Sequence, residues 1–185
     1  MIHPLSSVHP DTRIGTNTMV WQFTVILQGA VIGDHCNINC QVGIEGDVVI
    51  GDHVTMKPFV CVGEGTRIGD HVFMAPNVTC INDRNPRSKQ YPDEYPRTTL
   101  EDWCSIGAGS VIFPGVRVGK YALVGACSAV TKDVPDHALV FGNPARQVAW
   151  VDTKGMPMQQ DGDEFVGPTG ERYRIGTSGL VPIET

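Results

Sequence analysis

The stretch that decides the fold is residues 31–56, VIGDHCNINCQVGIEGDVVIGDHVTM, in which an apolar residue returns at every sixth position. The same spacing extends without interruption from Ile2 to Cys80, fourteen positions in all. With 41% hydrophobic residues in the chain, such a run has a chance probability of roughly four in a million. The residue four places further on is small or β-branched, as at Ala30, Cys36, Val42, Val48, Val54 and Val60.

This spacing excludes ordinary secondary structure, because an α-helix repeats every 3.6 residues and a strand every two. The 21 glycines and 13 prolines also argue against a helical protein. A six-residue unit with two inward positions and a Gly or Asn corner describes one short strand and one turn. Three units make a triangular coil, and stacked coils pair their backbones about 4.8 Å apart. The sequence therefore predicts an all-β protein, a parallel β-helix that is stable only as a stack of coils.

The repeat breaks after Cys80 and resumes at Ile106, continuing to Val130. The interval is not a multiple of six, so we expect the chain to leave the coil and return over residues 83–104. A long loop in a tight repeat is usually functional or lies between subunits. A tolerated surface insertion is the alternative.

Composition limits the classes of partner. The net charge of −6 argues against nucleic acid or an anionic membrane surface as the main partner. The sequence has neither a recognisable signal peptide nor a convincing membrane span, so we expect no membrane insertion and a cytoplasmic location. The six cysteines form no Cys-x-x-Cys pair, which favours buried thiols over disulfides or a zinc site.

Over residues 1–150 the repeat resembles the left-handed β-helix acyltransferases, the hexapeptide-repeat family. The segments TKDVP (131–135) and GNPAR (142–146) resemble the end of the coenzyme A-binding coils in that family. The resemblance implies a left-handed helix, acetyl-CoA as co-substrate, and a homotrimer with active grooves between subunits. Residues 151–185 depart from the period, and we expect short strands there that cap the last coil. A flexible linker over 153–162 is the alternative.

A candidate catalytic site follows from the coil length, because residues 18 apart lie in register. Glu64 should stack next to Asn82, about 5 Å away at the backbone, with Asp83 and Arg84 where the loop departs. The segment NDRNPRSK (82–89) resembles acetyltransferases that modify nucleotide-linked 3-amino sugars for surface polysaccharides such as lipopolysaccharide O-antigen. Asp83 matches the members that use dTDP-3-amino-3,6-dideoxyhexoses, and Asn85 matches those that use UDP-linked 3-amino-glucuronate.

The resemblance implies an acetyl-CoA-dependent N-acetyltransferase. Asn82 can hydrogen-bond either the incoming amine or the developing oxyanion, and Glu64 and Asp83 can orient the amine or act as bases. Some of the cations Arg84, Arg87 and Lys89 can clamp a diphosphate. The structural alternatives are that Asn82 caps a turn and that Glu64 is an exposed carboxylate at a corner. The three loop cations would then be ordinary solvated charges.

Coenzyme A should lie along the second block of repeats. Its small residues would allow a pantetheine arm to approach the backbone, and two cations are placed to meet its phosphates. These candidates are Gly107, Ala108, Gly125 and Ala126 for the arm, and Lys132 and Arg146 for the phosphates. Corner glycines and ordinary surface cations are the alternative.

His35, His53 and His71 are 18 residues apart and should form a ladder along one corner. Imidazoles suit a metal hydratase of the γ-class carbonic anhydrase type, but that family's His-x-x-x-x-His pair is missing here. Histidine also tolerates left-handed turns, so we expect turn residues and no metal. A sugar O-acetyltransferase with His137 as base is a further alternative, although His137 lies beyond the last clear repeat.

Overall fold

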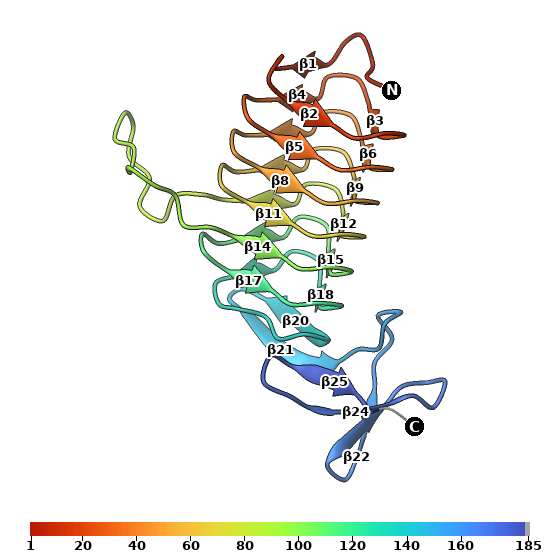
Figure 1. Cartoon of the computed structure of the whole chain (residues 1–185). Helices are drawn as coiled ribbons and strands as arrows, with labels where there is room; N and C mark the ends of the chain where they lie inside the picture. Colours follow the sequence, from red (N-terminus) through yellow and green to blue (C-terminus); the bar gives the residue numbers. More distant parts are fainter. Residues whose placement is uncertain (184–185) are drawn as a thin grey trace.

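The computed structural model describes residues 1–183, which form a stack of triangular coils followed by a small separate sheet (Figure 1). Three sheets run along the stack, and their strands are parallel except for the last strand of the third sheet, which is antiparallel to its neighbour. Sheet 1 contains β1 (Ser7–Val8), β4 (Val25–Ile26), β7 (Gly43–Ile44), β10 (Cys61–Val62), β13 (Thr79–Cys80), β16 (Val111–Ile112) and β19 (Ala129–Val130). Sheet 2 contains β2 (Arg13–Ile14), β5 (Val31–Ile32), β8 (Val49–Ile50), β11 (Arg67–Ile68), β14 (Thr99–Leu100) and β17 (Arg117–Val118). Sheet 3 contains β3 (Met19–Val20), β6 (Asn37–Ile38), β9 (Thr55–Met56), β12 (Phe73–Met74), β15 (Ser105–Ile106), β18 (Leu123–Val124), β20 (Ala138–Gly142) and β21 (Ala145–Trp150).

The predicted left-handed parallel β-helix is confirmed, with the register that the period of six requires. Ile44 pairs with Ile26 on one side and with Val62 on the other, each 18 residues away. The apolar residues that recur at every sixth position point inward and form one continuous core. In this core Ile32, Ile38 and Met56 are at most 2% exposed. Burial of this apolar column, at about 25 cal/mol per Å², is what each single coil could not achieve alone.

The coil corners explain the repeated Ile-Gly-Asp triplet. A Cβ atom on Gly33 would stand 2.3 Å from Asp52 Oδ1 and 2.6 Å from the Gly51 carbonyl oxygen, so only glycine fits between coils. The Asp52 carboxylate in turn accepts a hydrogen bond from the backbone N–H of Asp34, at 2.7 Å. Each coil therefore holds the previous one through a side chain as well as through the strands.

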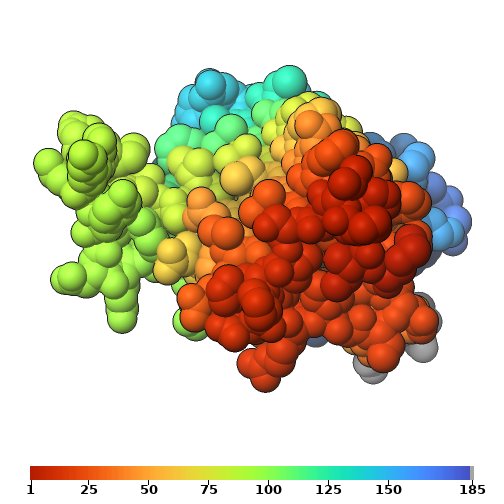
Figure 2. Space-filling view, turned by 90° about the horizontal axis from the view of Figure 1, so that it is seen from above, coloured from red at the N-terminus to blue at the C-terminus, as the bar shows by residue number. Residues whose placement is uncertain are grey.

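The loop excursion projects from the stack, as the green segment in Figures 1 and 2 shows. It begins after β13 but ends earlier than the predicted residue 104. Thr98 and Leu100 are already inward, 1% and 0% exposed, and Arg67 pairs with Thr99, 32 residues later. Because Leu100 stands one six-residue step before Ile106, it belongs to the repeat. Ile81 still donates its N–H to the carbonyl oxygen of Ile112 in the next coil, so the protruding segment covers residues 83–97.

The tail forms an antiparallel sheet of β22 (Gln159–Asp161), β23 (Glu164–Val166), β24 (Arg172–Ile175) and β25 (Leu180–Pro182). The short strands predicted around Phe165, Tyr173 and Val181 are present. β22 lies inside the segment for which a linker was the alternative. The sheet has its own small core of Phe165, Tyr173 and Leu180.

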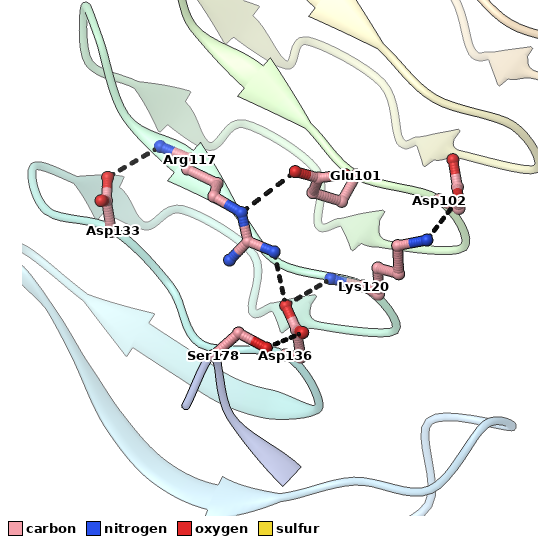
Figure 3. Close-up of polar contacts among 7 residues, drawn as sticks. All are labelled: Glu101, Asp102, Arg117, Lys120, Asp133, Asp136 and Ser178. Atoms are coloured by element: carbon pink, nitrogen blue, oxygen red, sulfur yellow. Dashed lines mark hydrogen bonds and ion pairs between the residues drawn. The ribbon is translucent and has the colours of Figure 1, made fainter. Parts of the chain in front are cut away.

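The tail is joined to the last coils through Asp136 (Figure 3). Its carboxylate accepts hydrogen bonds from Arg117 Nη2 at 2.8 Å, from the backbone N–H of Lys120 at 3.0 Å, and from Ser178 Oγ at 2.6 Å. Arg117 also pairs with Glu101 at 3.0 Å. The negative charge of Asp136 is thus balanced by a cation within the network.

All six cysteines are free thiols. The prediction of buried thiols holds for Cys36, Cys80 and Cys104, whereas Cys61 and Cys127 are exposed. Burial raises the pKa of Cys80 to about 12, so this thiol stays protonated and inert. Residues 1–183 contain no helix of the length and apolarity that would cross a membrane.

Candidate functional site

A groove of about 660 Å³ lies at the root of the loop, where sheet 1 turns toward sheet 2. The coils supply one wall and the loop supplies the other. Its lining residues are Leu27, Glu45, Gly46, Glu64, Asn82, Asp83, Pro86, Arg87, Gln90, Tyr91, Pro92 and Tyr95. The three predicted catalytic residues Glu64, Asn82 and Asp83 therefore share one groove.

The register places Glu64 and Asn82 on adjacent coils, since β10 and β13 pair residues 18 apart. The side chain of Asn82 and the backbone of Glu64 are linked through a third residue that the sequence did not reveal, Glu45. Glu45 Oε2 accepts a hydrogen bond from Asn82 Nδ2 at 2.9 Å and another from the backbone N–H of Glu64 at 2.9 Å. Glu45 precedes Asn82 by 37 residues, one more than two coils, so a search for residues 18 apart passes over it.

The groove is rich in negative charge. Partial desolvation, followed by the charges of Glu64, Asp83 and Glu45, raises the pKa of the Tyr95 phenol. Asp83 Oδ1 accepts a hydrogen bond from the backbone N–H of Asn85 at 2.8 Å, which fixes the first turn of the loop. Carboxylates in this arrangement attract an ammonium group and can hydrogen-bond a neutral amine.

The three predicted diphosphate-binding cations are not brought together. Arg87 lines the groove. Arg84 instead donates from Nη2 to the carbonyl oxygen of Pro114 at 3.0 Å, and so reaches toward the next coil. Lys89 is exposed in the outer part of the loop and is not among the residues that line the groove.

A neighbouring pocket of about 270 Å³ lies on the other side of Glu64. It is lined by Asp47, Glu64, Gly65, Pro92, Asp93, Glu94, Tyr95 and Arg97. Asp47 forms an ion pair with Arg67, with Oδ2 2.9 Å from Nη2. Glu64, Pro92 and Tyr95 line both the groove and this pocket and so lie between them.

The predicted coenzyme A residues divide into two groups. Lys132 and Arg146 line one pocket of about 300 Å³ with Asp133, Pro135 and Gln147 among its other walls. Close packing between neighbouring coils accounts for the two glycines without a bound ligand. A Cβ on Gly107 would stand 2.5 Å from the backbone nitrogen of Ala126.

Gly125 is constrained in the same way, since a Cβ there would stand 2.7 Å from the Cβ of Phe141. Of the two alanines, Ala108 is half-buried and its carbonyl oxygen accepts the N–H of Cys127 at 2.8 Å, whereas Ala126 is exposed. The two glycines let successive coils approach each other, and Ala126 is the exposed residue of the four.

The histidine ladder is confirmed. The rings of His35, His53 and His71 stack with centroids 4.9 and 4.6 Å apart, and the stack continues onto Trp103 and Tyr121. The three histidines have φ of 55–58°, the left-handed turn conformation. Stacked rings do not converge on a common point, and within residues 1–183 no three His, Cys, Asp or Glu side chains cluster as metal ligands would.

His137 is 4% exposed and lies beneath Tyr121, with Nδ1 2.9 Å from the carbonyl oxygen of Val151. Burial lowers its pKa. It lines neither the groove nor the neighbouring pocket, so it is placed as part of the junction with the tail and not as a base for O-acetylation.

Comparison with known proteins gives one relative of nearly the same length. The chain is 46% identical over 173 residues to a dTDP-3-amino-3,6-dideoxy-α-D-galactopyranose 3-N-acetyltransferase of Aneurinibacillus thermoaerophilus, covering 94% of this chain and 90% of that protein. No family model matches.

Many solved structures share the fold, among them two with bound nucleotide and coenzyme A ligands. One is PerB of Caulobacter crescentus in complex with CoA and GDP-perosamine, with a TM-score of 0.53 and 24% identity over 80% of this chain and 56% of that one. The other is the N-acyltransferase AntD of Bacillus cereus with dTDP and 3-hydroxybutyryl-CoA, with a TM-score of 0.58 and 21% identity over 83% and 80%. At these identities the likeness establishes the architecture alone.

Proposed function

The chain belongs to the left-handed β-helix acyltransferases that N-acetylate nucleotide-linked amino sugars, and from this premise we propose its substrate and the residues that act on it. It transfers an acetyl group from acetyl-CoA to the 3-amino group of a dTDP-linked 3-amino-3,6-dideoxyhexose. The observation that carries the proposal is the groove at the loop root. There an amide and three carboxylates converge in a chain 46% identical to an enzyme of that specificity.

The reaction forms a C–N bond and breaks a C–S bond. The neutral sugar amine attacks the thioester carbonyl carbon, the tetrahedral intermediate expels the coenzyme A thiolate, and that thiolate takes the proton released by nitrogen. Glu64 and Asp83 attract and orient the amine, and Asn82 hydrogen-bonds it at the reacting position. This route needs positioned polar groups more than it needs a dedicated base.

The sugar nucleotide lies along the groove with its diphosphate near Arg87. An Arg fork suits phosphate oxygens, and Arg87 is the cation that lines the groove on the described part of the chain. Arg84 and Lys89 do not contribute in this arrangement. Asp83 matches the dTDP-sugar members and Asn85 the UDP-sugar members, and the 46% identity to an enzyme named for a dTDP-linked sugar favours dTDP as the carrier.

Acetyl-CoA binds along the second block of repeats. Lys132 and Arg146 share a pocket in which two positive charges face one hollow, and this donor set fits a phosphate of the nucleotide end. The exposed surface at Ala126 provides a path for the pantetheine arm toward the groove.

The active form is a homotrimer. Strand residues that point outward from sheets 1 and 3 carry no charge between Ser7 and Leu139, whereas sheet 2 presents Arg13, Arg67 and Arg117. Phe23 and Phe59, 58% and 51% exposed, lie at the corner where sheet 3 meets sheet 1. An uncharged surface that carries exposed aromatic side chains supports an interface between subunits on this side of the stack. Light scattering of the purified protein should give the mass of three chains, and a monomer would contradict this assignment.

The test of the activity is mass spectrometry of reactions that contain acetyl-CoA and dTDP- or UDP-linked 3-amino or 4-amino sugars. We expect one added acetyl group on the dTDP-linked 3-amino sugar, with release of free coenzyme A thiol. Acetylation of the UDP-linked sugar alone would overturn the assigned carrier. The absence of product from every amino sugar would overturn the proposed function.

A further inference from the structure

We infer that Glu45 is a positioning residue, which holds the side-chain amide of Asn82 so that its carbonyl oxygen is free to accept a hydrogen bond from the substrate amine. The inference rests on the proposed function, since it needs an amine to reach Asn82. Glu45 lies on a different coil from Asn82. Of the two roles open to Asn82, accepting from the amine or donating to the oxyanion, this contact favours the first.

The evidence begins with the contacts of one oxygen atom. Glu45 Oε2 lies 2.9 Å from Asn82 Nδ2 and 2.9 Å from the backbone nitrogen of Glu64. The two donors come from two different coils, and both face the groove. A carboxylate oxygen held by two donors has little rotational freedom, so the position of Asn82 follows from that of Glu45.

The chemistry of the pair then fixes which way the amide faces. An ionised carboxylate can only accept hydrogen bonds, whereas an amide has one donating and one accepting end. Asn82 must therefore turn its NH₂ group toward Glu45. Its Oδ1 accepts no hydrogen bond from the described residues and remains the open end of the side chain in the groove.

This orientation favours one of the two roles of Asn82, and the exchange of functional groups at positions 45 and 82 tests it. An amine that attacks a carbonyl carbon needs its lone pair aimed at that carbon, and an acceptor that holds one N–H from the opposite side provides that aim. Oδ1 is such an acceptor. Stabilising the oxyanion would instead fall to the one N–H of Nδ2 that Glu45 does not accept, at the end of the amide that Glu45 holds.

The decisive experiment exchanges the two functional groups. Asn82→Asp alone places two carboxylates against each other and should lower kcat by about 10²-fold. The double variant Asn82→Asp/Glu45→Gln restores a donor facing an acceptor between positions 45 and 82 with the same total charge as the wild type, and it leaves a free acceptor oxygen at position 82. It gives up only the contact with the backbone N–H of Glu64, because the amide nitrogen that faces position 82 cannot accept it. We expect kcat of the double variant to exceed that of Asn82→Asp by at least about tenfold, with an unchanged KM for acetyl-CoA.

Recovery in the double variant also separates the two roles, because aspartate has no N–H with which to stabilise an oxyanion. A second measurement is a mutant cycle with alanine. Glu45→Ala should lower kcat about tenfold in the wild-type background and have no further effect in the Asn82→Ala background, because a residue that acts through Asn82 cannot act without it.

The matched control is Asp52→Ala, since Asp52 also accepts a backbone N–H from a neighbouring coil but lies at another corner. Its kcat should equal that of the wild type, and thermal melts should show all variants folded. A double variant no more active than Asn82→Asp, or independent losses in the alanine cycle, would overturn the role of Glu45. The wild type would still acetylate the sugar in that case, whereas an inactive wild type would point to a failure of the proposed function itself.

Discussion

Two corners of the same coils use carboxylates in different ways. At the corner between sheets 2 and 3, Asp34, Asp52 and Asp70 repeat one contact, in which an Oδ1 accepts a backbone N–H from the preceding coil. At the corner between sheets 1 and 2, Glu45 accepts a backbone N–H from the following coil and also the side-chain amide of Asn82. The first pattern is periodic, and the second occurs where the loop interrupts the period.

The difference shows how a repeat protein acquires a site. A contact that recurs in every coil stabilises the stack and has no reason to favour one coil over another. The contact of Glu45 with Asn82 and Glu64 is made once, beside a groove, and Glu45 forms no ion pair with the described residues. Polar groups in such a place are available to bind a ligand. The variants below test that distinction, from the largest expected effect to the smallest.

Asn82→Ala should lower kcat by about 10²–10³-fold, the loss typical when one hydrogen-bonding group at a reacting centre is removed. The melting temperature should change little, because Asn82 lies at a half-buried groove wall and not in the core. Steady-state kinetics with acetyl-CoA and the preferred sugar measure the effect. A loss smaller than tenfold would place the reacting centre elsewhere.

Arg87→Ala should raise the KM for the nucleotide sugar by about tenfold, which corresponds to about 1.4 kcal/mol of lost binding. The value of kcat should stay within about twofold, since Arg87 holds the diphosphate and not the amine. Lys89→Ala is the control, because Lys89 does not line the groove and its removal should leave KM unchanged. Equal effects of the two variants would show that the loop attracts the nucleotide only by its general charge.

The fold was predictable from sequence because the inward residues recur at a fixed spacing that only a coil can bury. The end of the loop was misplaced because Leu100 is the only residue of the six-residue repeat that precedes Ile106 in the second block. The position six residues earlier is Glu94, which is not apolar and breaks the repeat.

Glu45 was missed because its side chain reaches Asn82, 37 residues away, at a spacing that does not match a whole number of coils. The direction of Arg84 depends on a long flexible side chain that finds the Pro114 carbonyl in three dimensions. Spacing along the chain predicts backbone register, but it does not predict where such side chains reach.

Asp136→Ala should lower the melting temperature by about 4–8 °C, which corresponds to about 2 kcal/mol for a protein of this size. It removes an acceptor that receives hydrogen bonds from three groups and joins the tail to the coils. Activity measured well below the melting temperature should persist. Differential scanning calorimetry measures the shift, and an unchanged melting temperature would show that the tail sheet adds nothing to the stability of the stack.

The same residue makes stability depend on pH. Burial opposes ionisation of Asp136, but the hydrogen bonds from Ser178 and Arg117 outweigh it and lower its pKa below the usual value. A carboxylate with a depressed folded-state pKa contributes its stability above the unfolded pKa of about 3.9 and loses it as the pH falls through the folded-state value. The wild type should therefore lose stability below about pH 4, and Asp136→Asn should show a flatter decline. Parallel declines in both proteins would assign the acid sensitivity to other groups.

Asp52→Ala should have the smallest effect, a loss of about 1 kcal/mol and about 2–4 °C in melting temperature. It removes one hydrogen bond to the backbone N–H of Asp34 at an exposed corner, and the strands on either side stay paired. The value of kcat should not change, because this corner faces away from the loop root. If Asp52→Ala lowered kcat as far as Glu45→Ala does, the two corners would not differ in kind, and the loss in both variants would reflect loosened coils and not a disturbed site.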